Sequence, residues 1–481
     1  MRSTFHSIPL NIVLLCLGLL CSAAFFLISS TGDLRPHIAL FLSLFGLAFA
    51  CYSLAIFRIS GSTDESSGKS PLALIIFFAL AMRVIMLTGD YPQLTDDIYR
   101  YVWDARVAAA GINPFTHPPQ DDALAPLRDD DLFPKINHPH IPTIYPPLLQ
   151  ALFRLAALFS EQIIAMRILF VLFDLATLFL LILLLRTHAR PLEYSLIYAW
   201  NPLLIIETAG SGHVDSAGVF LLVLAFLLLR HRRTMAGIAA LTLATLTKFV
   251  PAILLPWMLK NRPARTRYTG IAVFLLLIIL AYLPYLSAGD RLFAALGTYS
   301  SKWEFNASLF KLIYLPVHAL LPDAAVRIFA AIKGLTANDA TLVTFRVDLA
   351  LLISKAIAGS LFAGVYFILW KREKNGDGEE REKIWLLLFG FLCMLSPTLH
   401  PWYLIWLLPV LSLYPDKAWI LLTGTIMLSY TVVGRYYFEG IWQENTLVRL
   451  LIFVPFYAML LYEHQSRLRA VLLKKIRNRD K

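Results

Sequence analysis

The chain has 481 residues, of which 58% are hydrophobic and only 16% are charged. Soluble domains carry about 25% charged residues and rarely contain repeated apolar stretches of about 20 residues. The composition therefore excludes a soluble globular protein and predicts an all-α, polytopic integral membrane protein. The formal net charge of +11 is explained by lysines and arginines in cytoplasmic loops, not by binding of nucleic acid.

The apolar segments follow one another along the whole chain, at residues 9–29, 38–57, 71–88, 162–185, 191–208, 214–229, 234–259, 268–287, 346–370, 384–414, 418–434 and 446–462. Basic residues on both sides of 234–259 require this segment to enter the membrane and return. We expect two short helices there, with a turn at Lys248, and a similar pair in 384–414, with a turn at His400. Counting both pairs predicts about 12–14 membrane segments in one transmembrane domain.

Clusters of lysine and arginine predict the orientation of these segments, because such clusters accumulate on the cytoplasmic side. The clusters lie at 186–190, 230–233, 260–267, 371–374 and 467–481, so both termini are expected to be cytoplasmic. The extracytoplasmic side then receives residues 89–161, 210–215, 248–250, 288–345, 396–403 and 435–445. Because the polar interruptions of the apolar sequence all fall in this second set, we expect one site on the extracytoplasmic face, with a catalytic loop at 89–161 and a second large loop at 288–345.

The cysteines Cys16, Cys21, Cys51 and Cys393 all lie inside apolar segments. They have no C-x-x-C spacing, so they are expected to behave as small hydrophobic side chains rather than as disulfides or metal ligands. The apolar segment 9–29 is longer than the core of a signal peptide and is expected to be the first transmembrane helix.

The catalytic loop begins with the most polar stretch of the chain, Thr95-Asp96-Asp97-Ile98-Tyr99-Arg100-Tyr101 followed by Trp103-Asp104. The spacing predicts an interfacial helix over about 95–110, capped by Thr95 or Asp96, with Asp97, Arg100, Tyr101 and Asp104 on one face. A second, amphipathic helix is expected over about 147–160, with Pro146-Pro147 at its start.

These motifs resemble the GT-C superfamily of polytopic glycosyltransferases, which use polyprenyl-phosphate sugars as donors, and most of all the bacterial polyprenyl-phosphate-mannose-dependent mannosyltransferases. The resemblance rests on the polar stretch above and on Gly111-Ile112-Asn113-Pro114, Ile144-Tyr145-Pro146-Pro147, Gly212-His213-Val214-Asp215, Thr247-Lys248-Phe249 and His400-Pro401-Trp402-Tyr403.

The resemblance implies inverting transfer of a hexose, with mannose preferred, from a lipid-linked donor to a glycan or lipid acceptor. It places the reaction on the extracytoplasmic face of the bacterial inner membrane. It also implies an acidic base in an early extracytoplasmic loop. Here that loop follows the third apolar segment and not the first, which is a departure from the family pattern.

Sugar transfer requires a base that takes the proton of the acceptor hydroxyl, a contribution typically worth about 10²–10⁴ in rate. Asp96 and Asp97 are the candidates, because burial near a membrane boundary can adapt a carboxylate to this task. The alternative for either residue is that it only caps the helix, and we expect one residue in each role.

Four side chains are candidates for binding the donor phosphate: Arg100, Arg106, Lys248 and His400. Charge-assisted hydrogen bonds to phosphate oxygens are strong. For the arginines the alternative is pairing with Asp97 or Asp104 on the same helix. For Lys248, which interrupts an apolar segment, the alternative is a side chain that extends to the membrane surface.

A further set is expected to contact the sugar substrates: Tyr101, Asp104, Asn113, Tyr145, His213, Asp215, Trp303, Trp402 and Tyr403. His213 and Asp215 could instead cap a helix, Trp402 and Tyr403 could belong to an interfacial aromatic belt, and Trp303 could lie in an ordinary loop.

We expect neither a metal ion nor a cofactor. His117, His138 and His140 match no standard ligand spacing, and a monophosphate donor has no pyrophosphate for a metal to bridge. Two other functions stay open. A transporter or flippase would need repeat-related broken helices, which 234–259 and 384–414 resemble. An O-antigen ligase or polymerase would use a pyrophosphate donor.

Overall fold

The computed structural model describes residues 8–60, 69–89, 94–334, 339–373 and 381–477. Within these ranges the regular structure is helical, and the extended pairing is limited to one isolated parallel bridge between Phe305 and Thr398. The prediction of an all-α protein is confirmed.

The described part of the chain contains α2 (Leu10–Ser30), α3 (Ile38–Ser60), α4 (Lys69–Leu87), α5 (Asp97–Ala109), α6 (Pro147–Ala157), α7 (Ile163–Thr187), α8 (Leu196–Ala199), α9 (Pro202–Ile205), α10 (Asp215–Arg230), α11 (Thr234–Thr245), α12 (Leu255–Leu259), α13 (Ala264–Tyr282), α14 (Ala294–Lys302), α15 (Leu309–Leu320), α16 (Asp323–Ile332), α17 (Asp339–Arg372), α18 (Arg381–Leu395), α19 (Leu408–Leu413), α20 (Lys417–Thr425), α21 (Thr431–Glu439) and α22 (Thr446–Arg477). Short 3-10 helices lie at Arg35–His37, Asp122–Leu127, Phe133–Lys135, Leu192–Ser195, Val250–Leu254, Leu283–Phe293, Pro401–Leu407 and Ile426–Tyr430, and a π-helical turn lies at Ile206–Gly210.

Eight helical stretches among the described residues are long and apolar enough to cross a membrane: Leu10–Ser30, Arg35–Ser60, Ser70–Leu87, Ile163–Thr187, Ala264–Lys302, Thr341–Arg372, Lys417–Glu439 and Thr446–Gln465. A ninth is added if α15 and α16, which are bent by 99° from one another, form one span. The protein is therefore a polytopic integral membrane protein. The other predicted segments are shorter or broken helices.

The chain divides into two compact units, each assembled from segments that are distant in sequence. The first unit contains Met1–Ile98, Gln162–Leu227 and Leu404–Lys481, and the second contains Tyr99–Glu161 and Leu228–Tyr403.

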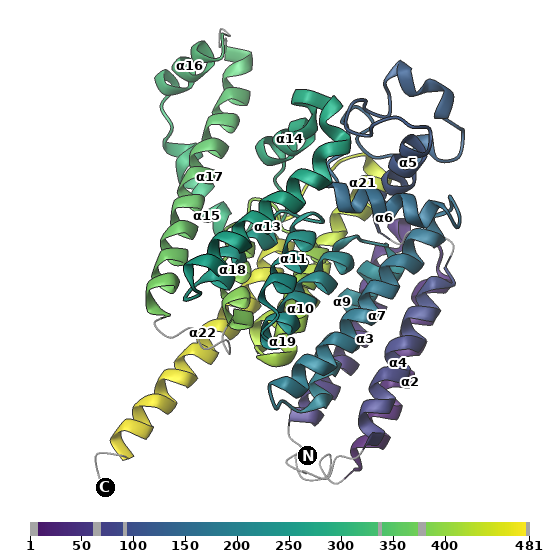
Figure 1. The fold of residues 1–481 in the computed structure, drawn as a ribbon, viewed down its shortest axis with the longest axis vertical. Helices are drawn as coiled ribbons and strands as arrows, with labels where there is room; N and C mark the ends of the chain where they lie inside the picture. Colours follow the sequence, from purple (N-terminus) through teal and green to yellow (C-terminus); the bar gives the residue numbers. More distant parts are fainter. Residues whose placement is uncertain (1–7, 61–68, 90–93, 335–338, 374–380, 478–481) are drawn as a thin grey trace. The chain divides into compact units, whose positions relative to one another are not determined.

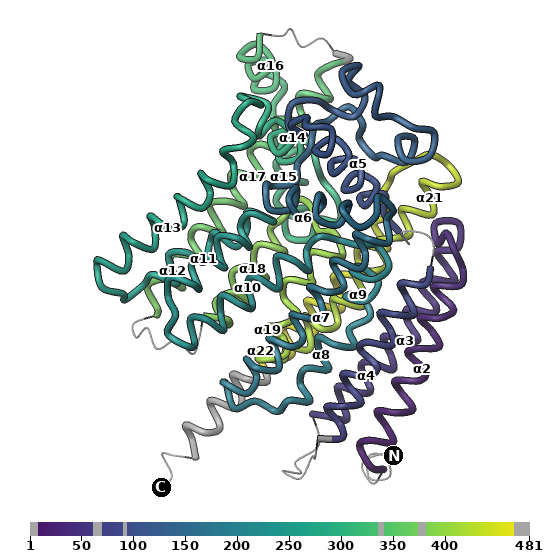
Figure 2. Tube along the Cα trace, turned by 45° about the vertical axis from the view of Figure 1, so that its right-hand side comes forward, coloured from purple at the N-terminus to yellow at the C-terminus, as the bar shows by residue number. Residues whose placement is uncertain are grey.

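In the first unit, α2 packs along both α3 and α4, and the three helices lie side by side in both views (Figures 1 and 2). The buried face of α2 repeats every three or four residues and includes Leu14, Leu17, Cys21 and Phe25. Its other face is equally apolar, as the exposed Leu19 illustrates. This is the pattern expected of a helix with one face against protein and one against lipid.

The predicted segment 191–208 is not one continuous helix. It breaks between α8 and α9, because Pro202 has no backbone N–H to continue the helical hydrogen bonds. The side-chain oxygen of Asn201 accepts from the N–H groups of Leu203 and Leu204 at 3.1 and 3.3 Å, so it caps α9. Its amide nitrogen donates to the hydroxyls of Tyr52 and Thr423, which fastens the break to other helices.

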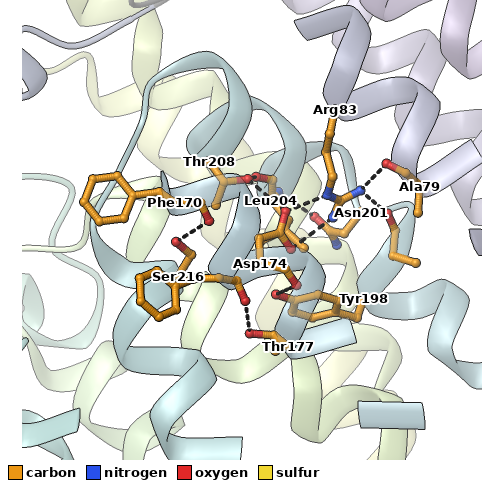
Figure 3. Close-up of polar contacts among 12 residues, drawn as sticks. Ala79, Arg83, Phe170, Asp174, Thr177, Tyr198, Asn201, Leu204, Thr208 and Ser216 are labelled. Carbon is orange, nitrogen blue, oxygen red and sulfur yellow. Dashed lines mark hydrogen bonds and ion pairs between the residues drawn. The ribbon is translucent and has the colours of Figure 1, made fainter. Parts of the chain in front are cut away.

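A buried ion pair joins α4 to α7 inside the first unit (Figure 3). Arg83 Nε lies 2.6 Å and Nη2 3.1 Å from the two carboxylate oxygens of Asp174, and neither side chain is exposed. Arg83 also donates to the carbonyls of Ala79 and Ala199, and Thr208 donates to Asp174 at 3.3 Å. The pair therefore connects two spans to the helical break and to the π-helical turn.

In the second unit, α11 packs on α13, and α15 and α16 pack on the long α17. The two predicted breaks are present: α11 ends at Thr245 before Lys248, and α18 ends at Leu395 before His400. α15 lies beside α17 (Figure 1), and the buried cluster they share includes Phe310 and Tyr314 of α15 and Ala350 and Leu351 of α17.

The loop that the sequence predicts to be catalytic, residues 89–161, has the two predicted helices, with α5 at Asp97–Ala109 and α6 starting at Pro147. Residues 90–93 of the predicted loop lie outside the described residues. Within the second unit, Asp129 accepts hydrogen bonds from the backbone N–H of Leu132 and from Arg106, and together they lower the pKa of Asp129 to about 2. The acidic segment between the helices is thus folded around an ionised carboxylate.

Candidate active site

The start of α5 presents the two candidate bases in the first unit. Thr95 Oγ1 accepts a hydrogen bond from the backbone N–H of Asp97 at 3.2 Å, so the hydroxyl expected to cap the helix does contact its first residue. The carboxylates of Asp96 and Asp97 are directed to partners elsewhere in the unit.

Asp96 belongs to a three-residue ion network. Arg35 Nη1 lies 3.1 Å from the Asp96 carboxylate, while Nε and Nη2 of Arg35 bind the Asp33 carboxylate, with Nη2 at 2.8 Å. Burial raises the pKa of Asp96; the Arg35 charge opposes this effect, and the negative charges of Asp97 and Asp33 add to it. For Asp33 burial also acts upward, but the hydrogen bonds from Arg35 outweigh it and the pKa is lowered. Asp96 is therefore a better proton acceptor than Asp33.

Asp97 faces a buried imidazole. His213 Nδ1 lies 4.0 Å from Asp97 Oδ2, and His213 Nε2 lies 3.2 Å from Glu207 Oε2. The other carboxylate oxygen of Glu207 accepts a hydrogen bond from the hydroxyl of Tyr430 at 2.7 Å. His213 and Glu207 are 1% and 0% exposed, so this chain of polar groups runs from Asp97 into the interior of the unit.

Arg167 of α7 fixes the segments on either side of this chain. It donates to the carbonyl of Ala209 at 2.8 Å and also to the carbonyls of Met86 and Gly89. The end of α4, which leads to the catalytic loop, is thereby attached to the π-helical turn that carries Glu207.

Asp215, a predicted substrate ligand or helix cap, is the first residue of α10 and is 2% exposed. Trp406 Nε1 donates to its carboxylate at 2.5 Å. Its predicted contact with substrate stays a prediction.

Four of the predicted residues meet in the second unit. Lys248 Nζ lies 3.9 Å from the centre of the Tyr403 ring, a cation–π distance. His400 stacks on Trp402 with ring centres 4.2 Å apart and meets Tyr403 edge-on at 5.5 Å. The two broken segments therefore bring a cation, an imidazole and two large rings together.

Trp303 and its neighbours from the second large loop join this group. Phe305 stacks on His400 at 4.8 Å, and the hydroxyls of Tyr299 and Tyr403 are 2.5 Å apart. Trp303 lies between Tyr299, at 5.5 Å, and His138 of the catalytic loop, at 5.0 Å. We call these residues the aromatic cluster: His138, Tyr299, Trp303, Phe305, His400, Trp402 and Tyr403.

Arg100 and Asp104 pair with each other within α5, as the alternative reading expected. Arg100 Nε lies 2.9 Å from Asp104 Oδ1, and both side chains are buried. The other oxygen of Asp104 accepts from Thr143 and from Gln150. Their predicted roles in binding substrate are untested.

The remaining predicted residues also contact protein groups of the second unit. Tyr101 packs on Tyr145 and on Phe153, with ring centres 5.0 and 4.8 Å apart. Arg106 pairs with Asp129 at 2.5 Å and Glu161 at 3.3 Å, and not with a carboxylate of its own helix.

Asn113 of the catalytic loop attaches that loop to the segment after α13. Its side-chain amide donates to the carbonyl of Tyr285 at 3.0 Å and to the Ser287 hydroxyl at 2.9 Å. This contact orders the loop, and a role of Asn113 in binding sugar stays a prediction.

Sequence reasoning missed four residues of the site: Asp33, Arg35, Glu207 and Tyr430. Glu207 had a detectable signal, because an acidic residue inside an apolar segment is a functional candidate by default. Arg35 and Asp33 had only their position between two apolar segments.

Among the described residues, no group of three or more His, Cys, Asp or Glu side chains is placed to hold a metal ion. His117 Nδ1 lies 2.8 Å from Asp121, and the rings of His138 and His140 meet edge-on with centres 6.0 Å apart. Metal independence stays a prediction.

Two family models match the sequence. The one described as alpha-(1->6)-mannopyranosyltransferase, N-terminal domain, matches residues 20–261, and the one described as glycosyltransferase family 87 matches residues 143–397. No match was found among curated proteins or among solved structures. The first range includes Asp96, Asp97 and His213, both ranges include Lys248, and His400 lies just beyond the second.

Proposed function

The chain belongs to these glycosyltransferase families and is an integral membrane glycosyltransferase, and from this premise we propose that it transfers a hexose, specifically mannose, from a polyprenyl-phosphate donor to a glycan or lipid acceptor. The observation that carries the proposal is the placement of Asp96 and Asp97 at the start of α5, where Arg35 and His213 surround them. A pair of carboxylates held by such partners can take a proton from an acceptor hydroxyl. Both matching families are glycosyltransferase families, which favours an enzyme over a transporter or flippase.

In the proposed reaction, the acceptor hydroxyl gives its proton to the base as its oxygen forms a bond to the anomeric carbon of the donor sugar. The bond between that carbon and the phosphate oxygen breaks on the opposite face, and its electron pair leaves with the polyprenyl phosphate. One substitution of this kind inverts the anomeric configuration.

We assign the base to Asp97, with Asp96 as the alternative. The guanidinium of Arg35 already donates a hydrogen bond to the Asp96 carboxylate at 3.1 Å, so the lone pairs of this carboxylate are partly engaged. The imidazole of His213 lies farther from Asp97, at 4.0 Å, and a catalytic contact can be long before substrate binds and shorten afterwards. The raised pKa of Asp96 is the argument for the alternative.

We propose that Lys248 and His400 bind the leaving phosphate and that the rings beside them stack on sugar. The support is the contact of Lys248 with Tyr403 and of His400 with Trp402 in the aromatic cluster. An ammonium and an imidazole can both donate to phosphate oxygens, and such charge-assisted bonds are about twice as strong as neutral ones. Arg100 and Arg106 are the weaker candidates, because each is paired with carboxylates.

We propose that the reaction takes place on the extracytoplasmic face of the inner membrane, with both termini in the cytoplasm. In the first unit, the network of Asp33, Arg35 and Asp96 has two negative charges and one positive charge and lies before the start of α3, whereas Arg58 and Arg186 lie in the last turns of α3 and α7. This asymmetry agrees with the preference of basic residues for the cytoplasmic side.

The test measures transfer of radiolabelled mannose from polyprenyl-phosphate mannose in membranes that contain wild-type or variant protein. We expect Asp97→Asn to reduce the rate by about 10²–10⁴. The matched control is Asp122→Asn, an exposed carboxylate of the same loop. Full transfer in both Asp96→Asn and Asp97→Asn would refute the base, and transfer only from a nucleotide sugar would refute the donor.

A further inference from the structure

The polar chain behind Asp97 has a component that the reaction above does not use. Glu207 is fully buried in the first unit, and its two carboxylate oxygens face His213 and Tyr430 at 3.2 and 2.7 Å. A buried carboxylate is costly unless polar groups surround it: the phenol of Tyr430 donates to one oxygen of Glu207, and the imidazole of His213 lies close to the other. They do not explain why an acidic residue is there.

The backbone shows how Glu207 comes to face His213. Glu207 lies on the π-helical turn, and its carbonyl accepts a hydrogen bond from the His213 backbone N–H at 2.8 Å. Gly212, two residues after the end of this turn at Gly210, has a φ of +73° and packs beside Ile98 and Arg167. Single π-helical turns often occur at functional sites because they redirect one side chain. Here the redirected chain brings the imidazole between two carboxylates.

The orientation of the imidazole follows from this geometry. Nε2 is the ring nitrogen nearer Glu207, at 3.2 Å from Oε2, and Nδ1 is the ring nitrogen nearer Asp97, at 4.0 Å from Oδ2. A proton on Nδ1 can form a hydrogen bond with Oδ2 of Asp97 once this distance shortens. The partner of one ring nitrogen sets the orientation and tautomer of the other, as in other carboxylate–imidazole pairs.

We propose that His213, oriented by Glu207 and Tyr430, is a positioning residue that holds the carboxylate of Asp97 in the rotamer needed for proton abstraction. The inference rests on the proposed function, since it gives His213 a role only through the base. His213 was expected to contact sugar directly. In the new assignment it contacts Asp97 and leaves the sugar to other groups.

The experiment is a double-mutant cycle between His213→Gln and Asp97→Asn, measured as kcat and KM for radiolabelled polyprenyl-phosphate mannose. If His213 acts through Asp97, His213→Gln lowers kcat about 10- to 100-fold with little change in KM, because a misplaced catalytic group costs rate and not binding. In the Asp97→Asn background the same substitution has no further effect, since the group that it positions is already absent.

A structural role gives a different result: equal fold-losses in both backgrounds, which would overturn the inference, as would an unchanged kcat in His213→Gln alone. Tyr430→Phe repeats the cycle with a smaller change, the loss of one hydroxyl, and we expect a 3- to 10-fold loss of kcat that again disappears in Asp97→Asn (about 1 kcal/mol for one hydrogen bond). His117→Gln, whose imidazole pairs with Asp121 in the exposed loop, is the control and keeps wild-type kcat.

The two levels of the proposal fail separately. Wild-type kcat in Asp97→Asn would show that Asp97 is not the base, whatever His213→Gln does. If Asp97→Asn loses most of its kcat while His213→Gln and Tyr430→Phe keep wild-type kcat, then Asp97 is the base and His213 does not position it.

Discussion

Arg35 is placed between two carboxylates and affects them unequally. It makes a multiple contact with Asp33, two positions away in sequence, and a single one with Asp96 from the start of α5. The pKa of Asp33 is therefore lowered, whereas burial keeps the pKa of Asp96 above its usual value despite the same guanidinium. At this scale the site contains one carboxylate fixed as an anion and one that is easier to protonate.

The first prediction concerns the pH dependence of transfer. Arg35→Gln removes the charge that holds down the pKa of Asp96, so this pKa rises and Asp96 binds a proton at higher pH. If transfer needs the ionised pair, the acidic limb of the kcat/KM profile moves to higher pH. Arg128→Gln, which loses contacts to the backbone carbonyls of Pro119 and Asp121 and to the Phe133 ring but none to Asp96, is the control. An acidic limb that stays in place or moves to lower pH in Arg35→Gln would contradict the argument.

Lys248 supplies the second prediction, because its ammonium is held 3.9 Å from the Tyr403 ring and the proposal gives it the donor phosphate. Lys248→Gln keeps a polar side chain but loses the charge. We expect KM for the lipid-linked donor to rise about 10- to 100-fold, the equivalent of one hydrogen bond to a charged group. Tyr403→Leu, which removes the ring, tests whether the ring positions the ammonium. Unchanged KM in Lys248→Gln would show that another group binds the phosphate.

At the scale of the elements, two features fix the helices of the first unit relative to one another. One is the Arg83–Asp174 pair between α4 and α7, and the other is the turn at Gly212. Both connect spans to the π-helical turn, through Thr208 in one case and through the backbone of His213 in the other. A buried ion pair is not by itself a source of stability, because each charge loses its hydration. Its effect is to make other arrangements of the two helices expensive.

The third prediction concerns the buried Arg83–Asp174 ion pair, which tolerates the loss of both charges better than the loss of one. Asp174→Leu or Arg83→Met alone leaves an uncompensated buried charge, so we expect a loss of roughly 3–5 kcal/mol in the free energy of unfolding. The double variant, Arg83→Met with Asp174→Leu, removes both charges and should recover most of the loss. Thermal unfolding in detergent measures all three. Losses that add in the double variant would mean that the two side chains act independently.

The fourth prediction concerns Gly212, and Gly111 is its matched control. Comparing the two glycines separates the cost of backbone strain from the cost of a steric clash. Gly212 and Gly111 have nearly the same backbone, with φ of +73° and +75°, so alanine at either position costs roughly 1–2 kcal/mol of strain. A Cβ at Gly212 would also lie 2.6 Å from Ile98 Cδ1, whereas at Gly111 it would meet nothing within 4 Å.

Because Ile98 follows Asp97 in α5, we expect Gly212→Ala to reduce kcat about 10-fold or more, and Gly111→Ala to leave kcat unchanged. Transfer assays, with thermal unfolding alongside, separate the two effects. Equal kcat in the two variants would mean that Gly212 serves only the backbone conformation.

At the scale of the whole molecule, the sequence predicted what depends on local pattern and missed what depends on partners. The helical class, the start of α6 and the breaks near Lys248 and His400 follow from hydrophobicity and proline, and the start of α5 follows from the cap residue Thr95. In a membrane protein, however, both faces of a span are apolar, so periodicity does not reveal which face meets which helix. The partners Arg83 and Asp174 are 91 residues apart, and Glu207 and Tyr430 are 223 residues apart, so no local signal could join them.

The last prediction tests the orientation on which the placement of the reaction depends. In the second unit, Asp130 is an exposed residue of the catalytic loop, and Arg232 is an exposed residue of the basic turn between α10 and α11. The proposed topology places the first outside the cell membrane and the second in the cytoplasm. In a variant whose Cys16, Cys21, Cys51 and Cys393 are replaced by serine or alanine, a membrane-impermeant maleimide applied to cells with a permeable outer layer should label Asp130→Cys at once. It should label Arg232→Cys only after the inner membrane is opened. The reverse pattern would place Asp96 and Asp97 on the cytoplasmic side, where a nucleotide sugar would be the available donor.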